Sequence, residues 1–309
     1  MIISASRRTD IPAYFSEWMM NRIKERYVYA RNPMNKQKIS KINLAPDAVD
    51  CIVFWSKNPK PMFDKLKSLN EYAYYFQFTL TSYDNDIETG LPLKNKLIDD
   101  FRQLSDMIGA IRVIWRYDPI LINARYTIAH HVDKFNEYAR KLKGYTDKVT
   151  ISFIDIYKKN ADNVKSHGIT EIKTEDKNII ADNFSKIALE NNLIIETCAE
   201  DIDLSLFNIG HARCIDDSLI SRITGKEYSL KKDKNQRLEC GCVKSADIGG
   251  YNSCLNGCIY CYANYNCRYV KSNTRKHDCF SPLLIGGLET EDVVTERKKE
   301  MREGQGELF

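Results

Sequence analysis

The stretch Cys51–Pro59, which reads CIVFWSKNP, joins a short apolar run to a polar end. Its first five residues are apolar, β-branched or aromatic, which is typical of a strand buried on both faces. Further runs of this kind occur at Ile2–Ala5, Tyr74–Leu80, Ile111–Trp115, Val149–Ile154 and Leu193–Thr197. Their recurrence predicts a sheet of buried strands.

Amphipathic stretches separate these runs, with apolar residues at helical spacing and charges on the opposite face. They lie at Ala13–Arg26, Pro61–Leu69, Lys94–Met107, Ala129–Leu142 and Glu175–Asn191. Alternating strands and helices predict an α/β fold with a parallel sheet. We expect a partial or complete (β/α) barrel of the TIM type. An open doubly wound sheet has the same alternation, but no glycine fingerprint for a nucleotide follows the first strand.

Polar residues follow most of the predicted strands. Ligands of both architectures bind at the carboxyl ends of the strands, so these residues are candidates for a catalytic site. Arginine suits a carboxylate or phosphate, and aspartate suits a ribose diol. The alternative is that these side chains cap helices and pair with one another across loops. The candidates are Arg7, Arg8, Asp10, Arg116, Asp118 and Glu196.

Composition places the chain among globular proteins. Its 309 residues have a formal net charge of only +4, too small to indicate a nucleic-acid or membrane-surface protein. No apolar run approaches the length of a signal peptide's core or a membrane span, which predicts a cytoplasmic protein with no membrane contact. Ten cysteines in a reducing compartment indicate metal or redox chemistry rather than disulfides.

Seven of the ten cysteines lie in the last quarter of the chain. We therefore expect two parts: residues 1–205 form the barrel body, and residues 206–309 form a cysteine-rich segment packed on it. Within that segment Cys254, Cys258 and Cys261 have the spacing C-x-x-x-C-x-x-C. Three thiolates can hold three irons of a 4Fe–4S cluster and leave the fourth iron open for another ligand.

The spacing, with Tyr260 just before the third cysteine, resembles the signature of radical S-adenosylmethionine enzymes. The resemblance implies a 4Fe–4S cluster on the three cysteines, with S-adenosylmethionine on the open iron and Tyr260 against its adenine. It further implies a 5′-deoxyadenosyl radical that abstracts hydrogen from a substrate, and an electron donor such as flavodoxin or ferredoxin. The substrate itself is not indicated.

In most such enzymes the cysteines follow the first barrel strand, whereas here they lie near the C-terminus. A circularly permuted barrel would reconcile the two, with residues 241–248 as the strand before the cysteines and Ile2–Ala5 next in space. The motif also resembles that of spore photoproduct lyase. Longer stretches, including SASRRTDIPAYFSEW, VIWRYDPI, CGCVKSADIGGYNSC and CIYCYANY, resemble an uncharacterised prokaryotic family, domain of unknown function 1848.

Four further cysteines form a candidate second site, for an iron–sulfur cluster or zinc. They are Cys198, Cys214, Cys240 and Cys242.

Other functions of the protein remain open. Zinc could replace the cluster, with Cys240 or Cys242 as fourth ligand, or a fourth protein ligand could make the cluster a simple electron carrier. Lysines and arginines among the tyrosines near the cysteines would also suit a nucleic-acid-binding protein.

Overall fold

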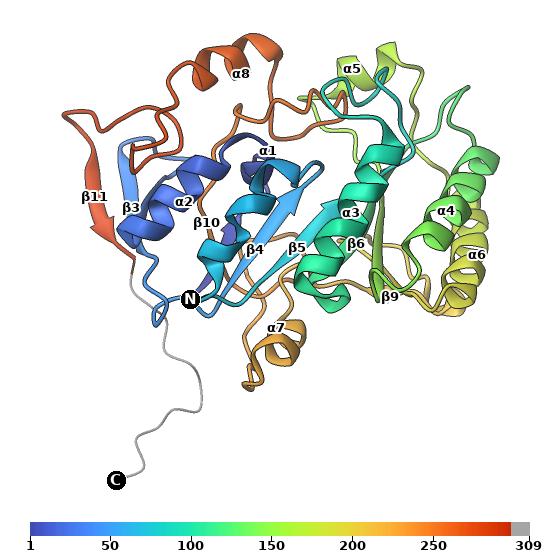
Figure 1. Ribbon diagram of the computed structural model, residues 1–309. Coiled ribbons are helices and arrows are strands. Elements are labelled where there is room, and N and C mark those ends of the chain that lie inside the picture. Colours follow the sequence, from blue (N-terminus) through green and yellow to red (C-terminus); the bar gives the residue numbers. More distant parts are fainter. Residues whose placement is uncertain (298–309) are drawn as a thin grey trace.

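The computed structural model describes residues 1–297 and contains one large parallel sheet of eight strands (Figure 1). In spatial order the strands are β10 (Ala246–Asp247), β1 (Ile2–Ala5), β4 (Cys51–Ser56), β5 (Tyr74–Thr79), β6 (Val113–Ile120), β7 (Lys148–Phe153), β8 (Ile194–Thr197) and β9 (Gly210–His211). Every neighbouring pair is parallel. From β1 to β9 the spatial order follows the chain order. The predicted α/β fold with a parallel sheet is therefore present.

The sheet is open. Within the described residues no pairing joins its two edge strands, β9 and β10, and each of them has only two residues. Such short edges offer few backbone groups for closure. The complete barrel that the sequence allows is thus not formed.

Strand β10 lies beside β1 although the whole main sheet separates them in sequence. Ile3 pairs with Ala246 and Ser4 with Asp247. The sequence predicts a strand within residues 241–248 next to Ile2–Ala5, and β10 occupies this place. The large sheet therefore takes strands from both predicted parts of the chain; of the segment 206–309, residues 298–309 lie outside the described residues.

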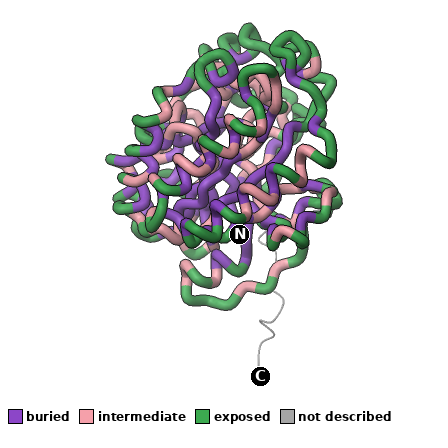
Figure 2. Tube along the Cα trace, turned by 90° about the vertical axis from the view of Figure 1, so that its right-hand side faces the viewer, coloured by how far each residue is buried: buried purple, intermediate pink, exposed green. Residues whose placement is uncertain are grey.

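Helices cover the sheet and connect its strands. They are α1 (Ile11–Tyr14), α2 (Ser16–Glu25), α3 (Lys94–Ile108), α4 (Ile128–Leu142), α5 (Ala161–Ser166), α6 (Thr174–Glu190), α7 (Asp217–Thr224) and α8 (Cys267–Thr274), with 3₁₀ helices η1 (Lys60–Leu69), η2 (Ala110–Arg112) and η3 (Ser205–Phe207). The core lies between helices and sheet, where Phe135 of α4 stacks on Phe184 of α6 with ring centroids 3.8 Å apart. The buried interior in Figure 2 corresponds to this layer.

A small second sheet lies at one side of the molecule (Figure 1). Strand β3 (Lys38–Asn43) pairs with β2 (Tyr27–Arg31) and, in parallel, with β11 (Val293–Glu296). These three strands are not predicted from the sequence; in β3, polar residues that include Lys41 separate the two apolar residues. None of the helices in residues 1–297 combines the length and apolar character needed to cross a membrane.

Candidate functional site

A cavity of about 520 Å³ opens at the carboxyl ends of the parallel strands. Residues after β1, β4, β7 and β8, and residues within β6, line it. The segment 236–263 supplies much of the remaining lining, including its five cysteines. The cavity therefore lies where an α/β sheet places its ligands. It brings together the residues that the sequence analysis selects, with one exception.

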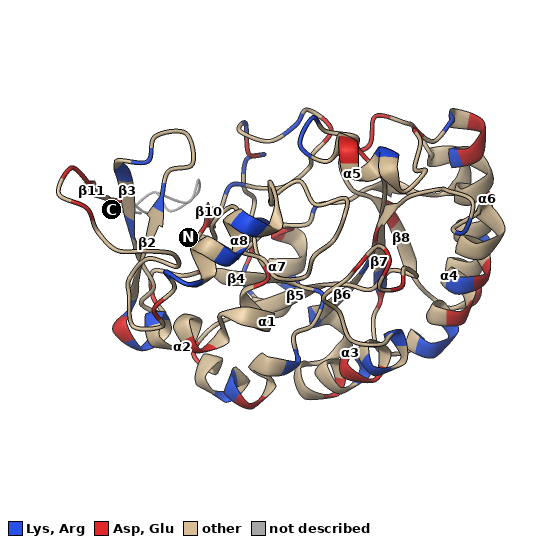
Figure 3. Ribbon diagram, turned by 90° about the horizontal axis from the view of Figure 1, so that it is seen from above, with Lys and Arg blue, Asp and Glu red and all other residues tan. Residues whose placement is uncertain are grey.

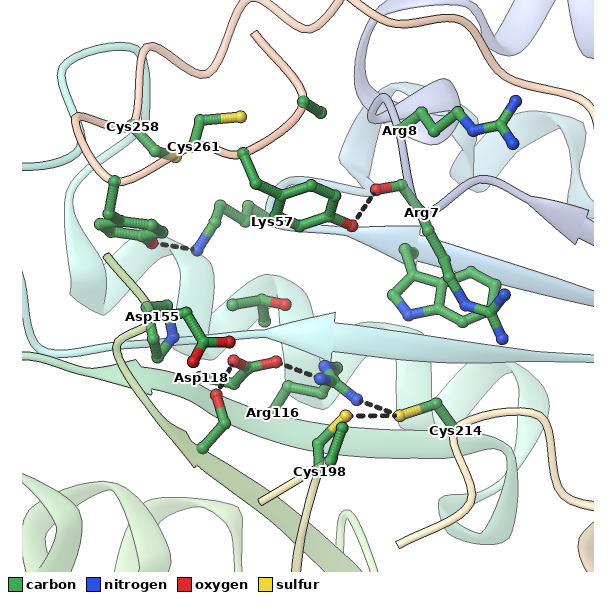
Figure 4. A pocket seen from close by; sticks show the side chains of 18 of the residues that line it. Arg7, Arg8, Lys57, Arg116, Asp118, Asp155, Cys198, Cys214, Cys258 and Cys261 are labelled. Carbon is green, nitrogen blue, oxygen red and sulfur yellow. Dashed lines mark hydrogen bonds and ion pairs between the residues drawn. The ribbon is translucent and has the colours of Figure 1, made fainter. Parts of the chain in front are cut away.

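The three cysteines of the C-x-x-x-C-x-x-C loop all line this cavity. Figure 4 shows Cys258 and Cys261 side by side above the strand ends. Burial raises the pKa of Cys258 to about 12, although the ammonium group of Lys57 opposes this shift. The thiols are therefore protonated in the metal-free protein, and metal binding would release these protons.

Asn256, within the loop, fixes it to the body of the protein. Its amide Nδ2 donates to Asp10 Oδ2 at 3.1 Å, and Tyr14 donates to its Oδ1 at 2.8 Å. Asp10 also accepts from the backbone N–H groups of Ala13 and Lys57, at 3.0 and 2.8 Å, so it caps α1 as well. The sequence makes Asp10 a catalytic candidate, and in the structure both its carboxylate oxygens hold three segments together.

Glycine is required at two points where the loop meets residues 84–94. A Cβ at Gly90 would lie 2.6 Å from the Leu255 carbonyl oxygen. At Gly257 a Cβ would lie 2.0 Å from Thr89 Oγ1, and the positive φ of 65° is itself unfavourable for other residues. The Gly90 N–H donates to the Asn256 carbonyl at 2.9 Å, and the Ile259 N–H donates to Ile87 at 3.0 Å. The protein's own contacts therefore fix the conformation of the loop backbone without a metal.

Tyr260 belongs to a buried ionic group that the sequence analysis misses. Lys57 Nζ donates to Glu88 Oε1 at 2.8 Å and to the Tyr260 hydroxyl at 2.9 Å, and Tyr260 donates in turn to Glu88. Lys94 contacts the other oxygen of Glu88 at 2.5 Å. Burial would raise the pKa of Glu88, but the two lysines hold it well below its usual range. Glu88 follows no predicted strand, so no sequence pattern singles it out.

Arg116 and Asp118 form an ion pair in the cavity. Both lie within β6, which is longer than predicted, and as residues i and i+2 they share one face of the strand. Arg116 also donates to Cys214 Sγ at 2.8 Å, while Asp118 accepts from Ser152 Oγ. Burial would raise the pKa of Asp118, but Arg116 holds it below the usual range. Arg116 therefore contacts both Asp118 and Cys214, and all three residues line the cavity.

Arg7 and Arg8 both line the cavity but differ in contacts. The Arg7 guanidinium lies over the Trp55 ring at 5.3 Å, and its backbone carbonyl accepts from the Tyr262 hydroxyl at 2.6 Å. Arg8 lies over Tyr251 and 4.0 Å from Asp247. Figure 4 shows the two side chains pointing in different directions.

Asp247 of β10 is a second residue that sequence reasoning misses. It accepts from the hydroxyls of Ser4 and Ser6, both at 2.8 Å, and from the Arg7 N–H at 3.0 Å. These bonds fasten the short strand β10 to β1. They thereby position the chain that leads into the three-cysteine loop.

Glu196 is the exception among the candidates: the prediction that it lines the pocket is wrong. It does not belong to the cavity lining and forms an ion pair with Lys148 Nζ at 2.8 Å instead. Lys148 begins β7, at the amino end of the strand, and draws the carboxylate away from the cavity. Glu196 therefore fits the alternative interpretation of the strand-end residues, in which charged side chains pair with one another.

The four cysteines of the candidate second site come together in the structure. The Sγ atoms of Cys198 and Cys214 lie 3.2 Å apart, and Cys214 and Cys240 each interact with the thiol of Cys242. That contact lowers the pKa of Cys240 to about 7. All four line the cavity, and Figure 4 shows Cys198 and Cys214 on the side opposite Cys258 and Cys261.

Within residues 1–297, no three His, Cys, Asp or Glu side chains are arranged as they stand to ligate one metal ion. Zinc requires sulfur atoms about 3.8 Å apart, from tetrahedral Zn–S bonds of about 2.3 Å. The Sγ atoms of Cys198 and Cys214 are closer than this, so the side chains of the four-cysteine group would have to turn about their Cα–Cβ bonds to bind a single ion.

Two of the basic residues near the cysteines lie on different parts of the chain. Arg237 pairs with Asp155 at 2.6 Å at the cavity, whereas Lys271 lies on α8. Figure 3 shows Lys and Arg mixed with Asp and Glu over most of the outer helices.

Fold and cavity define an α/β protein with a cysteine-lined site at the strand ends. A family model described as Domain of unknown function (DUF1848) matches residues 2–263, most of the chain. The chain belongs to this family. No curated protein and no solved structure matches it.

Proposed function

We propose that this protein is a radical S-adenosylmethionine enzyme with a 4Fe–4S cluster on Cys254, Cys258 and Cys261. The observation that carries the proposal is the position of the three thiols. They lie on one backbone-fastened loop over the strand-end cavity. The substrate class is not part of this proposal.

The donor set fits a cluster with one open iron. The loop supplies three thiols within eight residues, and its two other polar side chains are already bonded: Asn256 to Asp10 and Tyr14, and Tyr260 to Lys57 and Glu88. No loop side chain is therefore free to act as a fourth ligand. When held by the three thiols, a reduced cluster would supply one electron for cleavage of the C–S bond of S-adenosylmethionine to methionine and a 5′-deoxyadenosyl radical, which would take hydrogen from the substrate.

The protein's own residues would hold the reactants in a fixed position at the strand ends. The Lys57–Glu88 pair holds the Tyr260 hydroxyl, which orients that ring beside the cysteines. Arg7 and the Arg116–Asp118 pair offer charged groups for a carboxylate or a ribose. Asp10 acts through Asn256 and is a positioning residue.

The topology supports the same proposal. The open parallel sheet, read from β10 through β1 to β9, has the strand order of a partial barrel whose first strand is supplied by the C-terminal part of the chain. Read in this order, the cysteines follow the first strand. A circular permutation of the barrel is therefore part of the proposal.

The test is electron paramagnetic resonance of anaerobically reconstituted, dithionite-reduced protein, with and without S-adenosylmethionine. We expect a cluster signal that changes when S-adenosylmethionine is added, together with formation of 5′-deoxyadenosine. A protein that binds zinc and no iron, or whose signal is indifferent to S-adenosylmethionine, would refute the proposal.

A further inference from the structure

The four-cysteine group, Cys198, Cys214, Cys240 and Cys242, is separate from the three-cysteine loop and lies across the cavity from it (Figure 4). Three stretches of chain supply it. Cys198 directly follows β8, Cys214 follows β9, and the other two precede β10. Thiols that are remote in sequence meet here because the fold brings the ends of these elements to one place.

Backbone and side-chain hydrogen bonds hold the stretch around Cys214 in place. Its carbonyl accepts from Tyr75 at 2.7 Å and from Gln77 at 2.9 Å. Val243 N–H donates to the Ile215 carbonyl at 3.1 Å, which ties the Cys214 stretch to the Cys242 stretch. The positions of these cysteines are therefore built into the fold.

Two N–H groups point at the sulfur atoms. Arg116 Nη1 donates to Cys214 Sγ at 2.8 Å, and the backbone N–H of Ile215 donates to Cys242 Sγ at 3.4 Å. Metal-bound thiolates carry negative charge and accept such hydrogen bonds, which tune and orient them. Neutral thiols are weak acceptors and would gain little from a guanidinium.

A buried cation close by has an unsatisfied donor. Arg7 Nη2 is buried and, among the described residues, has no hydrogen-bond partner. Arg7 lines the same cavity as the four cysteines. A buried donor of a charged group that lacks a hydrogen bond is costly, and thiolates around a metal would supply negative charge near it.

We propose that Cys198, Cys214, Cys240 and Cys242 bind a second metal centre through four thiolates. With all ligand positions filled by protein, this centre has no site for S-adenosylmethionine or substrate. Four sulfur ligands suit an iron–sulfur cluster or a zinc ion equally, so the chemistry shared by both is tetrathiolate ligation. The inference does not depend on the proposed function.

The test compares metal and sulfide content in four anaerobically purified full-length proteins. They are the wild type, the triple variant C254A/C258A/C261A, the double variant C214S/C242S, and Cys267→Ser as a control. Cys267 is exposed and belongs to neither group. We expect the triple variant to keep one centre and the double variant to lose it while keeping the iron of the loop. The control should match the wild type.

The retained metal identifies the occupant. Iron with equal sulfide in the triple variant, about four of each for a cubane, means a cluster, and zinc without sulfide means a single ion. X-ray absorption at the edge of that metal should show sulfur as the nearest neighbours, at about 2.3 Å, with iron beyond them only if the centre is a cluster. This measurement uses the triple variant, so it stands even if the double variant does not fold.

A triple variant that binds no metal, or a double variant with wild-type metal content, would overturn the inference. Either result leaves the radical-enzyme proposal standing, which is tested by deoxyadenosine formation in the wild type. Conversely, a triple variant that retains metal supports the second centre even if the wild type forms no deoxyadenosine.

Discussion

The two cysteine groups face the same cavity but are built in different ways. The three-cysteine loop occupies eight consecutive residues and is held by hydrogen bonds to nearby segments, such as those of Asn256 with Asp10 and Gly90. The four-cysteine group comes from three distant stretches and lies beside buried guanidinium groups, Arg116 and Arg7. The loop is thus organised by local geometry, and the second group by the fold and by charge.

This difference shows what each group depends on. A loop held by local contacts should respond to changes in its own residues and in the few that touch it. A group assembled from three stretches should respond to any loss of the charges that hold those stretches together. The predictions below test this contrast, from the largest expected effect to the smallest.

Replacing Cys258 with alanine should have the largest effect. We expect the iron of the loop and the formation of 5′-deoxyadenosine to fall to background, because two thiolates cannot retain an open-iron cluster. The fold should persist, since the loop backbone is held by other residues. Iron analysis and a circular dichroism melt check this, with Cys267→Ser as the matched control. Unchanged iron content would show that the loop is not the cluster site.

Replacing Arg116 with methionine should destabilise the protein by about 3 kcal/mol, because it leaves the largely buried Asp118 carboxylate without its ion-pair partner. Urea unfolding measures the change. The double variant R116M/D118N should recover part of the loss, since no charge then remains unpaired. If R116M lowers the free energy of unfolding by well under 1 kcal/mol, charge does not hold the four-cysteine side of the cavity together.

The stability of the protein should depend on pH through His131, which lies near the three-cysteine loop. His131 is fully buried, and its ring lies 5.7 Å from that of Tyr83, which in turn contacts Tyr260. Its Nδ1 contacts the Tyr117 hydroxyl and its Nε2 the Leu121 carbonyl. Burial lowers the pKa of His131 to about 4, although the Leu121 carbonyl opposes the shift.

Between pH 6.5 and about 4 the unfolded chain therefore binds a proton at His131 that the folded protein does not. Stability from this group is complete above pH 6.5 and declines as the pH falls, by about 2 kcal/mol at pH 5. Urea unfolding at pH 7.5 and pH 5 should show a smaller difference for His131→Gln than for the wild type. The same change at exposed His167 controls for the loss of an imidazole. An equal pH dependence in both variants would contradict the assignment.

The smallest effect should come from Gly257, and a matched pair isolates it. Gly257 and Gly168 both have a φ of 65°, but only at Gly257 would a Cβ meet another residue, Thr89. We expect Gly168→Ala to cost about 1 kcal/mol from backbone strain alone. Gly257→Ala should cost more and should also lower the iron content. If both variants lose the same stability and Gly257→Ala keeps the wild-type iron content, the close approach to Thr89 is unimportant.

The sequence was a good guide where neighbouring residues decide the outcome. The strand Ile2–Ala5 is predicted with its observed bounds, and the run that begins at Cys51 extends by one residue to Ser56. Buried parallel strands are recognisable because both faces are apolar, so that a short window contains the whole signal. The three-cysteine loop is recognisable for a similar reason, since its spacing is local.

Only the tertiary structure decided which distant groups meet. It placed β10 beside β1, joined Lys57 and Glu88 to Tyr260, and left Glu196 outside the cavity with Lys148. It also left the sheet open and brought Cys198 to Cys214. Such contacts depend on how elements pack and on which ion pair is nearest after packing, and no local pattern encodes this. The sequence by itself therefore determined the strands, the helices and the cysteine loop, while the three-dimensional fold determined the site around them.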